Sequence, residues 1–203
     1  MSMCHRQVAT SVGLRFYNNA INLLLRGEVD RMNTHIDNAS GWTQGHRDTP
    51  VAALARAVVA HPDKVLFDFS GEKTTYAEFD ALTNCMAHAL QALGVKSGST
   101  VTSLFDNHLD AVVLWIALNK LSAVSVPLNT ALKGEFLRHQ VVDSGADIVV
   151  CDAIYAPRLF EVAEQIGNVK RVLVRGNLDA HPVVEFALEK LDAHRGHDAS
   201  PMK

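Results

Sequence analysis

Residues 101–126, VTSLFDNHLDAVVLWIALNKLSAVSV, decide the fold of this chain. They begin with 101–105, VTSLF, which we read as a short buried strand. Apolar residues at helical spacing follow over 109–121, and a second short apolar run lies at 123–126. This order of strand, helix and strand with short connections is typical of a parallel sheet.

The same alternation continues on both sides of this stretch. Downstream, we expect a helix at 134–142, a strand at 148–151, a helix at 159–166 and a last strand at 172–174. Upstream, we expect a helix that starts at Pro50 with Thr49 as its cap, a strand at 65–69, a turn at 70–73, and a helix that runs from the Thr75/Glu78 capping box to Gly94. The pattern predicts an α/β fold, a parallel sheet with helices on both faces.

Composition limits the possible classes of protein. The chain has 203 residues, of which 48% are hydrophobic, so it can form a substantial core. Its net charge of -3 and its scattered Lys and Arg residues exclude the basic stripe of a nucleic-acid-binding protein. Cys4, Cys85 and Cys151 lie far apart, which favours a reducing compartment over a disulfide framework. No apolar run approaches the roughly 18 residues of a transmembrane helix, so we expect a cytoplasmic protein.

Three regions differ in sequence pattern. Residues 1–31 share neither the periodicity nor the motifs of the rest, so we expect a disordered extension or an untranslated stretch before a natural start at Met32. Residues 32–178 carry the α/β pattern. Residues 179–203 form a polar tail, with one amphipathic segment at 183–191 that can form a short helix.

Ligands of open parallel sheets bind at the carboxyl ends of the strands, so the strand exits are the candidate sites. Polar residues follow the predicted strands at 106–108, 127–130, 151–152 and 175–177. The simpler interpretation is structural: Asp106 or Asn107 caps the helix at 109, and Thr130 caps the next helix. His108 suits proton transfer by its ordinary pKa but reads as a surface residue, and Asp152 alone does not make a metal site.

Motifs for other chemistries are missing from the sequence. It contains no dinucleotide-binding or Walker phosphate-binding glycine motif, no H-E-x-x-H and no paired C-x-x-C. His194 and His197 form an H-x-x-H pair, but Gly196 disfavours the helix that would present both to a metal. We therefore expect no metal site and assign no catalytic residue.

Several short blocks, in order and at consistent spacing over 49–175, resemble the adenylate-forming (AMP-binding, ANL superfamily) acyl-CoA synthetases, also called carboxylic acid–CoA ligases. The family's Thr-Tyr-x-Glu-Leu block is matched by Thr75, Tyr76 and Glu78, and its Leu-Gly-Val turn contains Gly94. The next block, Lys-x-Gly-Ala-x-x-Val-Pro-Leu-Asn-Thr, is matched by Lys120, Pro127, Asn129 and Thr130, and Asn107 lies on its flank. Residues 142–146 are similar to the Asp-Ser-x-Ala connection. Ser99 and Ser122 depart from the pattern, which usually has Asp and Gly there.

The resemblance implies that the sheet is part of the family's large N-terminal domain. It implies a two-step reaction, in which a carboxylic acid and ATP form an acyl-adenylate that then reacts with coenzyme A, with magnesium accompanying ATP. The family's phosphate loop, Ser/Thr/Gly-rich and ending in Pro-Lys-Gly, does not occur in the sequence. We therefore expect the chain alone to bind no cofactor and to be inactive. The missing C-terminal portion, or a complementary chain, would be its partner. The alternative is a standalone, non-catalytic α/β binding module derived from that scaffold.

Overall fold

The computed structural model describes residues 49–178, 183–194 and 198–202. The predicted extension at 1–31, and Met32 as a start, lie outside these residues. The chain divides into two compact units, one ending at Asp80 and the other beginning at Ala81. This boundary lies within the long helix α3 (Tyr76–Ala92) and was not predicted from the sequence.

The first unit combines helix α2 (Pro50–Ala60) with a hairpin of β1 (Val65–Phe69) and β2 (Glu72–Thr75). As predicted, Thr49 caps α2, with its hydroxyl oxygen accepting the Ala52 N–H at 3.1 Å. The hairpin turn places Ser70 and Gly71 at φ 54° and 91°, the left-handed pair that two-residue hairpins favour.

The start of α3 is built by the predicted capping box. The Thr75 N–H donates to Glu78 Oε2 at 2.8 Å, and the Glu78 N–H donates to the Thr75 hydroxyl at 3.3 Å. Each side chain thus satisfies a backbone donor that the helix leaves unpaired. The rings of Phe67 and Phe79 pack edge to face at 5.0 Å, and Phe79 is fully buried. These motif positions stabilise local structure in the first unit.

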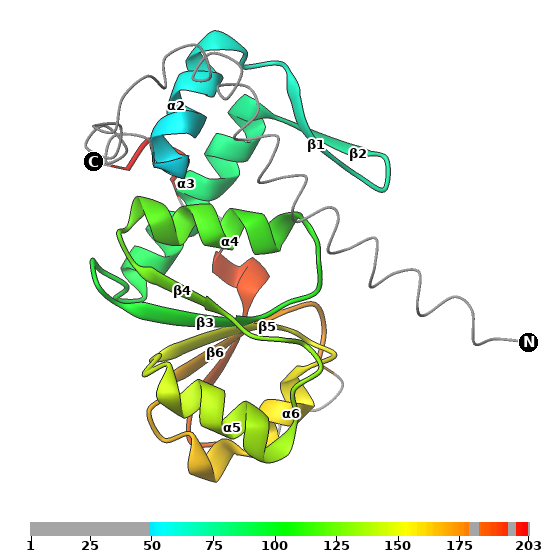
Figure 1. The fold of residues 1–203 in the computed structure, drawn as a ribbon, viewed down its shortest axis with the longest axis vertical. Coiled ribbons are helices and arrows are strands. Elements are labelled where there is room, and N and C mark those ends of the chain that lie inside the picture. Colours follow the sequence, from blue (N-terminus) through cyan, green and yellow to red (C-terminus); the bar gives the residue numbers. More distant parts are fainter. Residues whose placement is uncertain (1–48, 179–182, 195–197, 203) are drawn as a thin grey trace, which may run out of the picture. The chain divides into compact units, whose positions relative to one another are not determined.

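The second unit is a five-stranded parallel sheet in the order β4-β3-β5-β6-β7. Its strands are β3 (Thr100–Leu104), β4 (Val124–Pro127), β5 (Ile148–Asp152), β6 (Arg171–Arg175) and β7 (Ala187–Lys190). Helix α4 (Leu109–Lys120) covers one face, while α5 (Gly134–Asp143) and α6 (Ala156–Phe160) cover the other (Figure 1). The predicted α/β class is confirmed.

Strand order explains where this sheet would bind a ligand. Numbered from β3, the order is 2-1-3-4-5, the doubly wound order in which the chain reverses direction between the first and third strands. Here that switch point lies between β3 and β5. The loop after β3 leads to α4 on one face and the loop after β5 leads to α6 on the other. The carboxyl ends of these two strands therefore flank the expected crevice.

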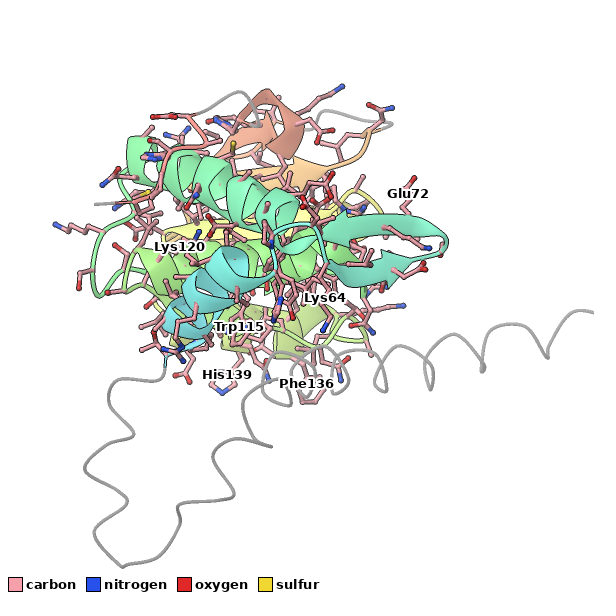
Figure 2. The ribbon with its side chains drawn as sticks, turned by 90° about the horizontal axis from the view of Figure 1, so that it is seen from above. Lys64, Glu72, Trp115, Lys120, Phe136 and His139 are labelled. Carbon is pink, nitrogen blue, oxygen red and sulfur yellow. The ribbon has the colours of Figure 1, made fainter. Side chains whose placement is uncertain are left out.

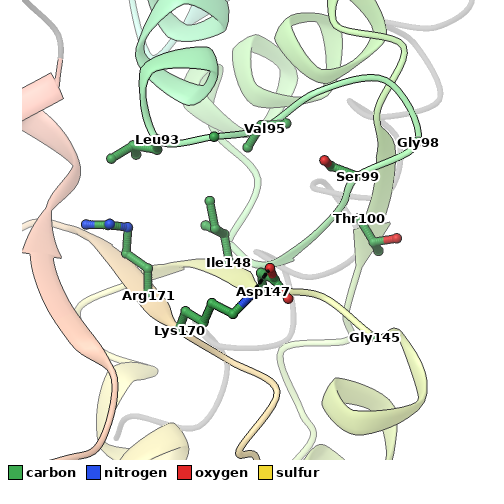
Figure 3. A pocket seen from close by; sticks show the side chains of 11 residues that line it. Leu93, Val95, Gly98, Ser99, Thr100, Gly145, Asp147, Ile148, Lys170 and Arg171 are labelled. Atoms are coloured by element: carbon green, nitrogen blue, oxygen red, sulfur yellow. Dashed lines mark hydrogen bonds and ion pairs between the residues drawn. The ribbon is translucent and has the colours of Figure 1, made fainter.

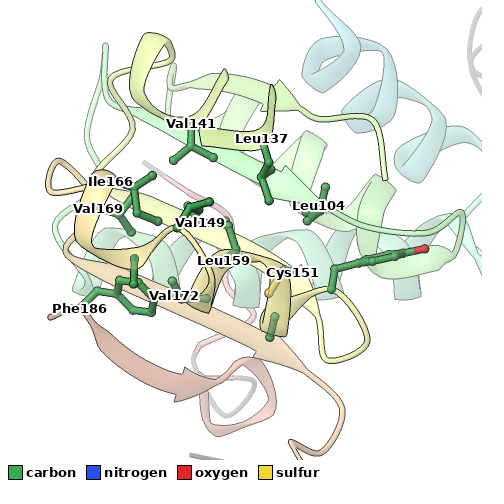
Figure 4. Packing of buried hydrophobic residues seen from close by; sticks show 14 of the residues in the cluster. Leu104, Leu137, Val141, Val149, Cys151, Leu159, Ile166, Val169, Val172 and Phe186 are labelled. Carbon is green, nitrogen blue, oxygen red and sulfur yellow. The ribbon is translucent and has the colours of Figure 1, made fainter. Parts of the chain in front are cut away.

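The main core lies between the sheet and α5/α6 (Figure 4). Leu137 and Val141 of α5 and Leu159 of α6 are fully buried against Val149 of β5 and Val172 of β6. All five residues of β5 are buried, and the first four, 148–151, are apolar, as expected for a strand that is covered on both faces. Phe136, the neighbour of Leu137, instead projects from the surface (Figure 2).

Two predicted helices are wrong in detail. Residues 159–166 do not form one helix, because α6 ends at Phe160 and a short 3₁₀ helix, η3 (Ala163–Gln165), follows. The 183–191 segment contributes the strand β7, and a 3₁₀ helix, η4 (Leu191–His194), comes after it. Leu159, Val162 and Ile166 of the first segment, and Phe186 and Leu191 of the second, are buried as their spacing indicated. Val183 is instead exposed, and the backbone of both segments takes a different form.

Edge strand β4 shows why proline is tolerated there. The N–H groups of Val124 and Leu128 donate to Ser99 and Ser103 on the β3 side at 2.8 Å each. Because strand residues alternate in direction, the nitrogen of Pro127 faces away from β3. No ladder hydrogen bond is lost, as expected for proline in an edge strand.

Ser122 occupies a backbone conformation that favours glycine. It follows α4 with φ 54°, and its carbonyl accepts the Gly98 N–H at 2.9 Å. The left-handed region costs a residue with a Cβ roughly 1–2 kcal/mol. Glycine, the residue that the resemblance leads us to expect here, avoids this cost, but part of the gain is offset because glycine has more conformational freedom in the unfolded chain.

We expect Ser122→Gly to raise the free energy of unfolding by about 0.5–1 kcal/mol, measured by urea denaturation. Ser122→Ala is the matched control, because it removes the hydroxyl but keeps the Cβ, and it should give no gain. Equal stabilisation by both variants would show that the hydroxyl, not the backbone conformation, is the source of the cost.

Candidate functional site

The loops at the carboxyl ends of β3, β5 and β6 meet around one buried carboxylate, Asp152. Arg175 Nε donates to its Oδ1 at 2.6 Å, and the backbone N–H of Asp106 donates to its Oδ2 at 2.9 Å. The Asp152 side chain is only 6% exposed, whereas that of Arg175 is 35% exposed. Asp152 therefore joins three strand exits that are far apart in the sequence.

His108 faces the same carboxylate. Its Nδ1 accepts the Asp110 N–H at 3.1 Å, which assigns the ring proton to Nε2 in the neutral imidazole. Nε2 lies 3.4 Å from Asp152 Oδ1, within ion-pair reach, but it makes no hydrogen bond of good geometry. His108 thus caps α4 and contributes electrostatically to Asp152. This corrects two expectations: neither Asp106 nor Asn107 is the cap, and His108 is not a surface residue.

Burial alone raises the pKa of Asp152, but its neighbours outweigh that effect. His108, Arg175 and the Asp106 N–H stabilise the ionised form and lower the pKa of the Asp152 carboxyl to about 2. The next residue inward, Cys151, responds in the opposite sense, since burial and the Asp152 charge raise the pKa of its thiol to about 12. Cys151 is therefore an unreactive core residue.

Tyr155 closes the switch-point crevice. Its hydroxyl donates to Asp106 Oδ1 at 2.6 Å, so the loop after β5 is tied to the loop after β3. Burial, and after it the hydrogen bond to Asp106, raise the pKa of Tyr155, so the phenol stays protonated and remains a donor. The position where doubly wound sheets usually admit a ligand is thus occupied by the chain's own side chains.

Arg158 holds the loop after β4. Its guanidinium donates to the carbonyls of Thr130 and Leu132 and lies over the Tyr155 ring, 4.7 Å from the ring centre. Asn129 shapes the same loop through its side-chain oxygen, which accepts the Ala131 N–H at 2.9 Å. The sequence predicted that Thr130 caps the next helix, and this prediction is wrong. The residue that precedes α5 is Lys133, and its side chain makes no cap hydrogen bond.

The nine family-motif positions do not form one site. Pro127 ends β4, and Asn107, Asn129 and Thr130 lie on loops at the carboxyl edge of the sheet. Gly94 instead follows α3 at φ 94°, and Lys120 ends α4. Thr75, Tyr76 and Glu78 belong to the first unit. Sequence reasoning named Asp106, His108, Asp152 and Arg175 as separate exits but missed Tyr155 and Arg158. No local signal marked these two, because their partners are set by the order of the strands.

A shallow depression of about 310 Å³ lies at the opposite, amino end of the sheet (Figure 3). Its two basic side chains are already paired: Lys170 with Asp147 at 2.6 Å, and Arg171 with Glu189. It therefore offers no free cation for an anionic ligand, and it is remote from the strand exits. We consider the carboxyl edge the better candidate on this geometry.

Two classes of feature do not occur in the described part of the chain. Its helices include none with the length and apolar character that a bilayer crossing requires. Its His, Cys, Asp and Glu side chains form no group of three suited to a metal ion.

Comparison with known proteins decides the family. The profile of the AMP-binding enzyme family matches residues 54–201. This chain belongs to the AMP-binding enzyme family. The match covers both units and every carboxyl-edge loop described above.

Relatives of this AMP-binding chain include ligases and peptide synthetases. It is 36% identical over 93 residues to the long-chain-fatty-acid–CoA ligase FadD13 of Mycobacterium tuberculosis, covering 46% of this chain and 18% of that protein. It is 31% identical over 102 residues to a 3-hydroxybenzoate–CoA ligase of Aromatoleum sp., covering 50% and 20%. Phosphinothricin tripeptide synthetase PhsC of Streptomyces viridochromogenes is 28% identical over 158 residues, covering 78% and 14%. The chain thus spans a fifth or less of these relatives' lengths.

Solved structures agree with the fold of the AMP-binding chain. The N-terminal domain of FACL13 from Mycobacterium tuberculosis superimposes with a TM-score of 0.62 at 25% identity, covering 74% of this chain and 36% of that one. The anthranilate–CoA ligase AuaEII gives a TM-score of 0.66 at 22% identity, covering 74% and 28%. The sheet and its helices therefore match the N-terminal region of acid–CoA ligases.

Proposed function

We propose that this chain contributes to the adenylate-forming domain of an ATP-dependent carboxylic acid–CoA ligase. The observation that carries the proposal is the family match over 54–201, together with CoA ligases among the relatives at 31% and 36% identity. In the proposed reaction, a carboxylate oxygen attacks the α-phosphorus of ATP and pyrophosphate leaves. The thiol of coenzyme A then attacks the acyl carbon and AMP leaves.

The described residues do not fit the triphosphate of ATP. Stabilising a transferring phosphoryl group requires free cations, Mg²⁺ or a cradle of backbone N–H groups. Four basic side chains at the two ends of the sheet are engaged by the protein itself: Arg175 by Asp152, Arg158 by loop carbonyls, Lys170 by Asp147, and Arg171 by Glu189. We derive no catalytic step through this part of the chain. Its proposed role is to shape the loops at one edge of the ligase domain.

The proposed compartment is the cytoplasm. Cys151 is a free thiol that is fully buried in the core. A protein that keeps its thiols reduced fits a reducing compartment.

We expect the 203-residue chain to give only background ATP–pyrophosphate exchange with a panel of aliphatic and aromatic acids. The gene read past the codon for Lys203, in all frames, should encode a Ser/Thr/Gly-rich loop ending in Pro-Lys-Gly. The protein extended to include the complete domain should then catalyse exchange with at least one acid and form its CoA ester.

Three outcomes would contradict this proposal. Exchange by the 203-residue chain alone would show that its residues suffice for adenylation. Exchange by the extended protein with amino acids, without CoA ester formation, would group it with the peptide synthetases. Absence of the phosphate loop from every frame would favour the non-catalytic binding module.

A further inference from the structure

Residues 198–202 lie against α3, because two side chains of that helix contact consecutive carbonyls of this segment. Asn84 Nδ2 donates to the Ala199 carbonyl at 3.1 Å, and His88 Nε2 lies 3.1 Å from the Ser200 carbonyl. Asn84 and His88 are four residues apart, so they lie on the same face of α3. The carbonyls they contact are more than 110 residues away in the sequence.

The orientation of Asn84 is fixed by a third residue, Lys120, at the end of α4. Lys120 Nζ donates to Asn84 Oδ1 at 2.5 Å. Because an ammonium group has donors only, the amide oxygen of Asn84 must face Lys120. The amide nitrogen then faces the Ala199 carbonyl, where a donor is needed. Asn84 itself is only 2% exposed, so its hydrogen bonds are made away from competing water.

The segment is also shaped from within. Asp198 accepts the Ser200 N–H at 2.8 Å and the Ser200 hydroxyl at 2.6 Å. This turn directs the carbonyls of Ala199 and Ser200 toward α3. The carbonyls of this mostly exposed segment therefore contact the side chains of Asn84 and His88 on α3.

We propose that Lys120, Asn84 and His88 form a main-chain clamp that positions residues 198–202 on α3. Lys120 orients Asn84, and Asn84 and His88 bind the backbone of the segment regardless of its side chains. The clamp gives a role to Lys120, a motif position at the end of α4, and it includes Asn84, which the sequence analysis did not single out. The proposal does not depend on the chemistry proposed above.

The test is the backbone order of Ala199 and Ser200, measured as ¹⁵N heteronuclear NOE values on the whole chain. Asn84→Asp is the decisive variant, because a carboxylate still accepts from Lys120 but cannot donate to the Ala199 carbonyl. We expect the NOE of both amides to fall from values typical of ordered backbone to values typical of a free terminus. His88→Ala, at a partly exposed position, should give a smaller decrease.

Lys120 has its own pair of variants. Lys120→Met removes the donor that orients Asn84 and should loosen the segment, whereas Lys120→Arg keeps a donor-only group and should preserve its order. Asn168→Asp is the matched control, since Asn168 also donates to two carbonyls, those of Val141 and Ala146, but outside the clamp. It should leave the Ala199 and Ser200 values unchanged.

The proposal is overturned if the Asn84→Asp protein keeps folded-state amide dispersion and wild-type NOE values at Ala199 and Ser200. It is equally overturned if Asn168→Asp loosens the segment as much as Asn84→Asp does, because general destabilisation would then explain both results. Should Asn84→Asp fail to fold, the comparison of His88→Ala with Lys120→Arg decides. The first must loosen the segment and the second must not.

Discussion

Asp152→Asn is expected to lower the free energy of unfolding by about 2–3 kcal/mol at pH 7, the cost of removing the charge from a buried pair whose cation stays partly solvated. The carboxylate accepts from Arg175 at 2.6 Å and from the Asp106 N–H at 2.9 Å, and asparagine cannot provide both contacts with equal strength. Urea denaturation of both proteins measures the difference.

The stability that Asp152 contributes depends on pH, and the direction follows from the pKa of its carboxyl. The folded-state pKa of Asp152, about 2, lies below the ordinary value of 3.8, so its ionisation stabilises the fold above about pH 4. That stabilisation, about 2 kcal/mol by linkage, is lost as the pH falls from about 4 to 2. The difference in free energy of unfolding between wild type and Asp152→Asn should therefore become smaller as the pH falls from about 4 to 2.

Asp147→Asn is the matched control for the Asp152 variant. Asp147 pairs with Lys170 at 2.6 Å, but both side chains are more than half exposed. Exposed ion pairs contribute little, so this variant should change stability by less than about 1 kcal/mol. A loss equal to that of Asp152→Asn would show that burial is not what makes the Asp152 contacts important.

Leu137→Ala is expected to cost about 3 kcal/mol, within the range for deleting a fully buried leucine. Leu137 is completely buried between α5 and the sheet, and truncation leaves a cavity among Val149 and the other residues of that core. The measurement is again urea denaturation, in which the midpoint should fall to lower urea while the slope stays unchanged.

Phe136→Ala is the natural comparison. Phe136 precedes Leu137 in α5 and is a larger side chain, but it is 76% exposed. Its removal should cost less than about 0.5 kcal/mol, as for most surface substitutions. A larger loss for Phe136→Ala than for Leu137→Ala would contradict the orientation of α5 on the sheet.

Much of the sheet could be predicted from the sequence because its inner strands are locally distinctive. The runs at 101–105, 148–151 and 172–174 lie within β3, β5 and β6 or extend one residue beyond them. Strand β7 was missed because Ala187–Lys190 carries Glu and Lys and has little strand preference of its own. It becomes a strand by pairing with β6, and that long-range contact leaves no local pattern.

The candidate site could be predicted only as a set of separate strand exits. Asp106 follows β3 and has the side chain of a helix cap, but it accepts the Tyr155 hydroxyl instead, and His108 takes over the capping. Arg175 and Asp152 pair because β5 and β6 are neighbours, which the order of elements along the chain does not specify. Local rules place the residues at the edge, and the strand order determines their partners.

Pro127 has a consequence for how this chain behaves in a crowded cell. Its nitrogen, on the outer side of β4, carries no hydrogen, so a foreign strand approaching that side meets a gap in the row of donors it would need. Such a gap opposes strand-by-strand growth of aggregates from that border. We therefore expect Pro127 to oppose pairing along this side of β4 when other unfolded chains are nearby.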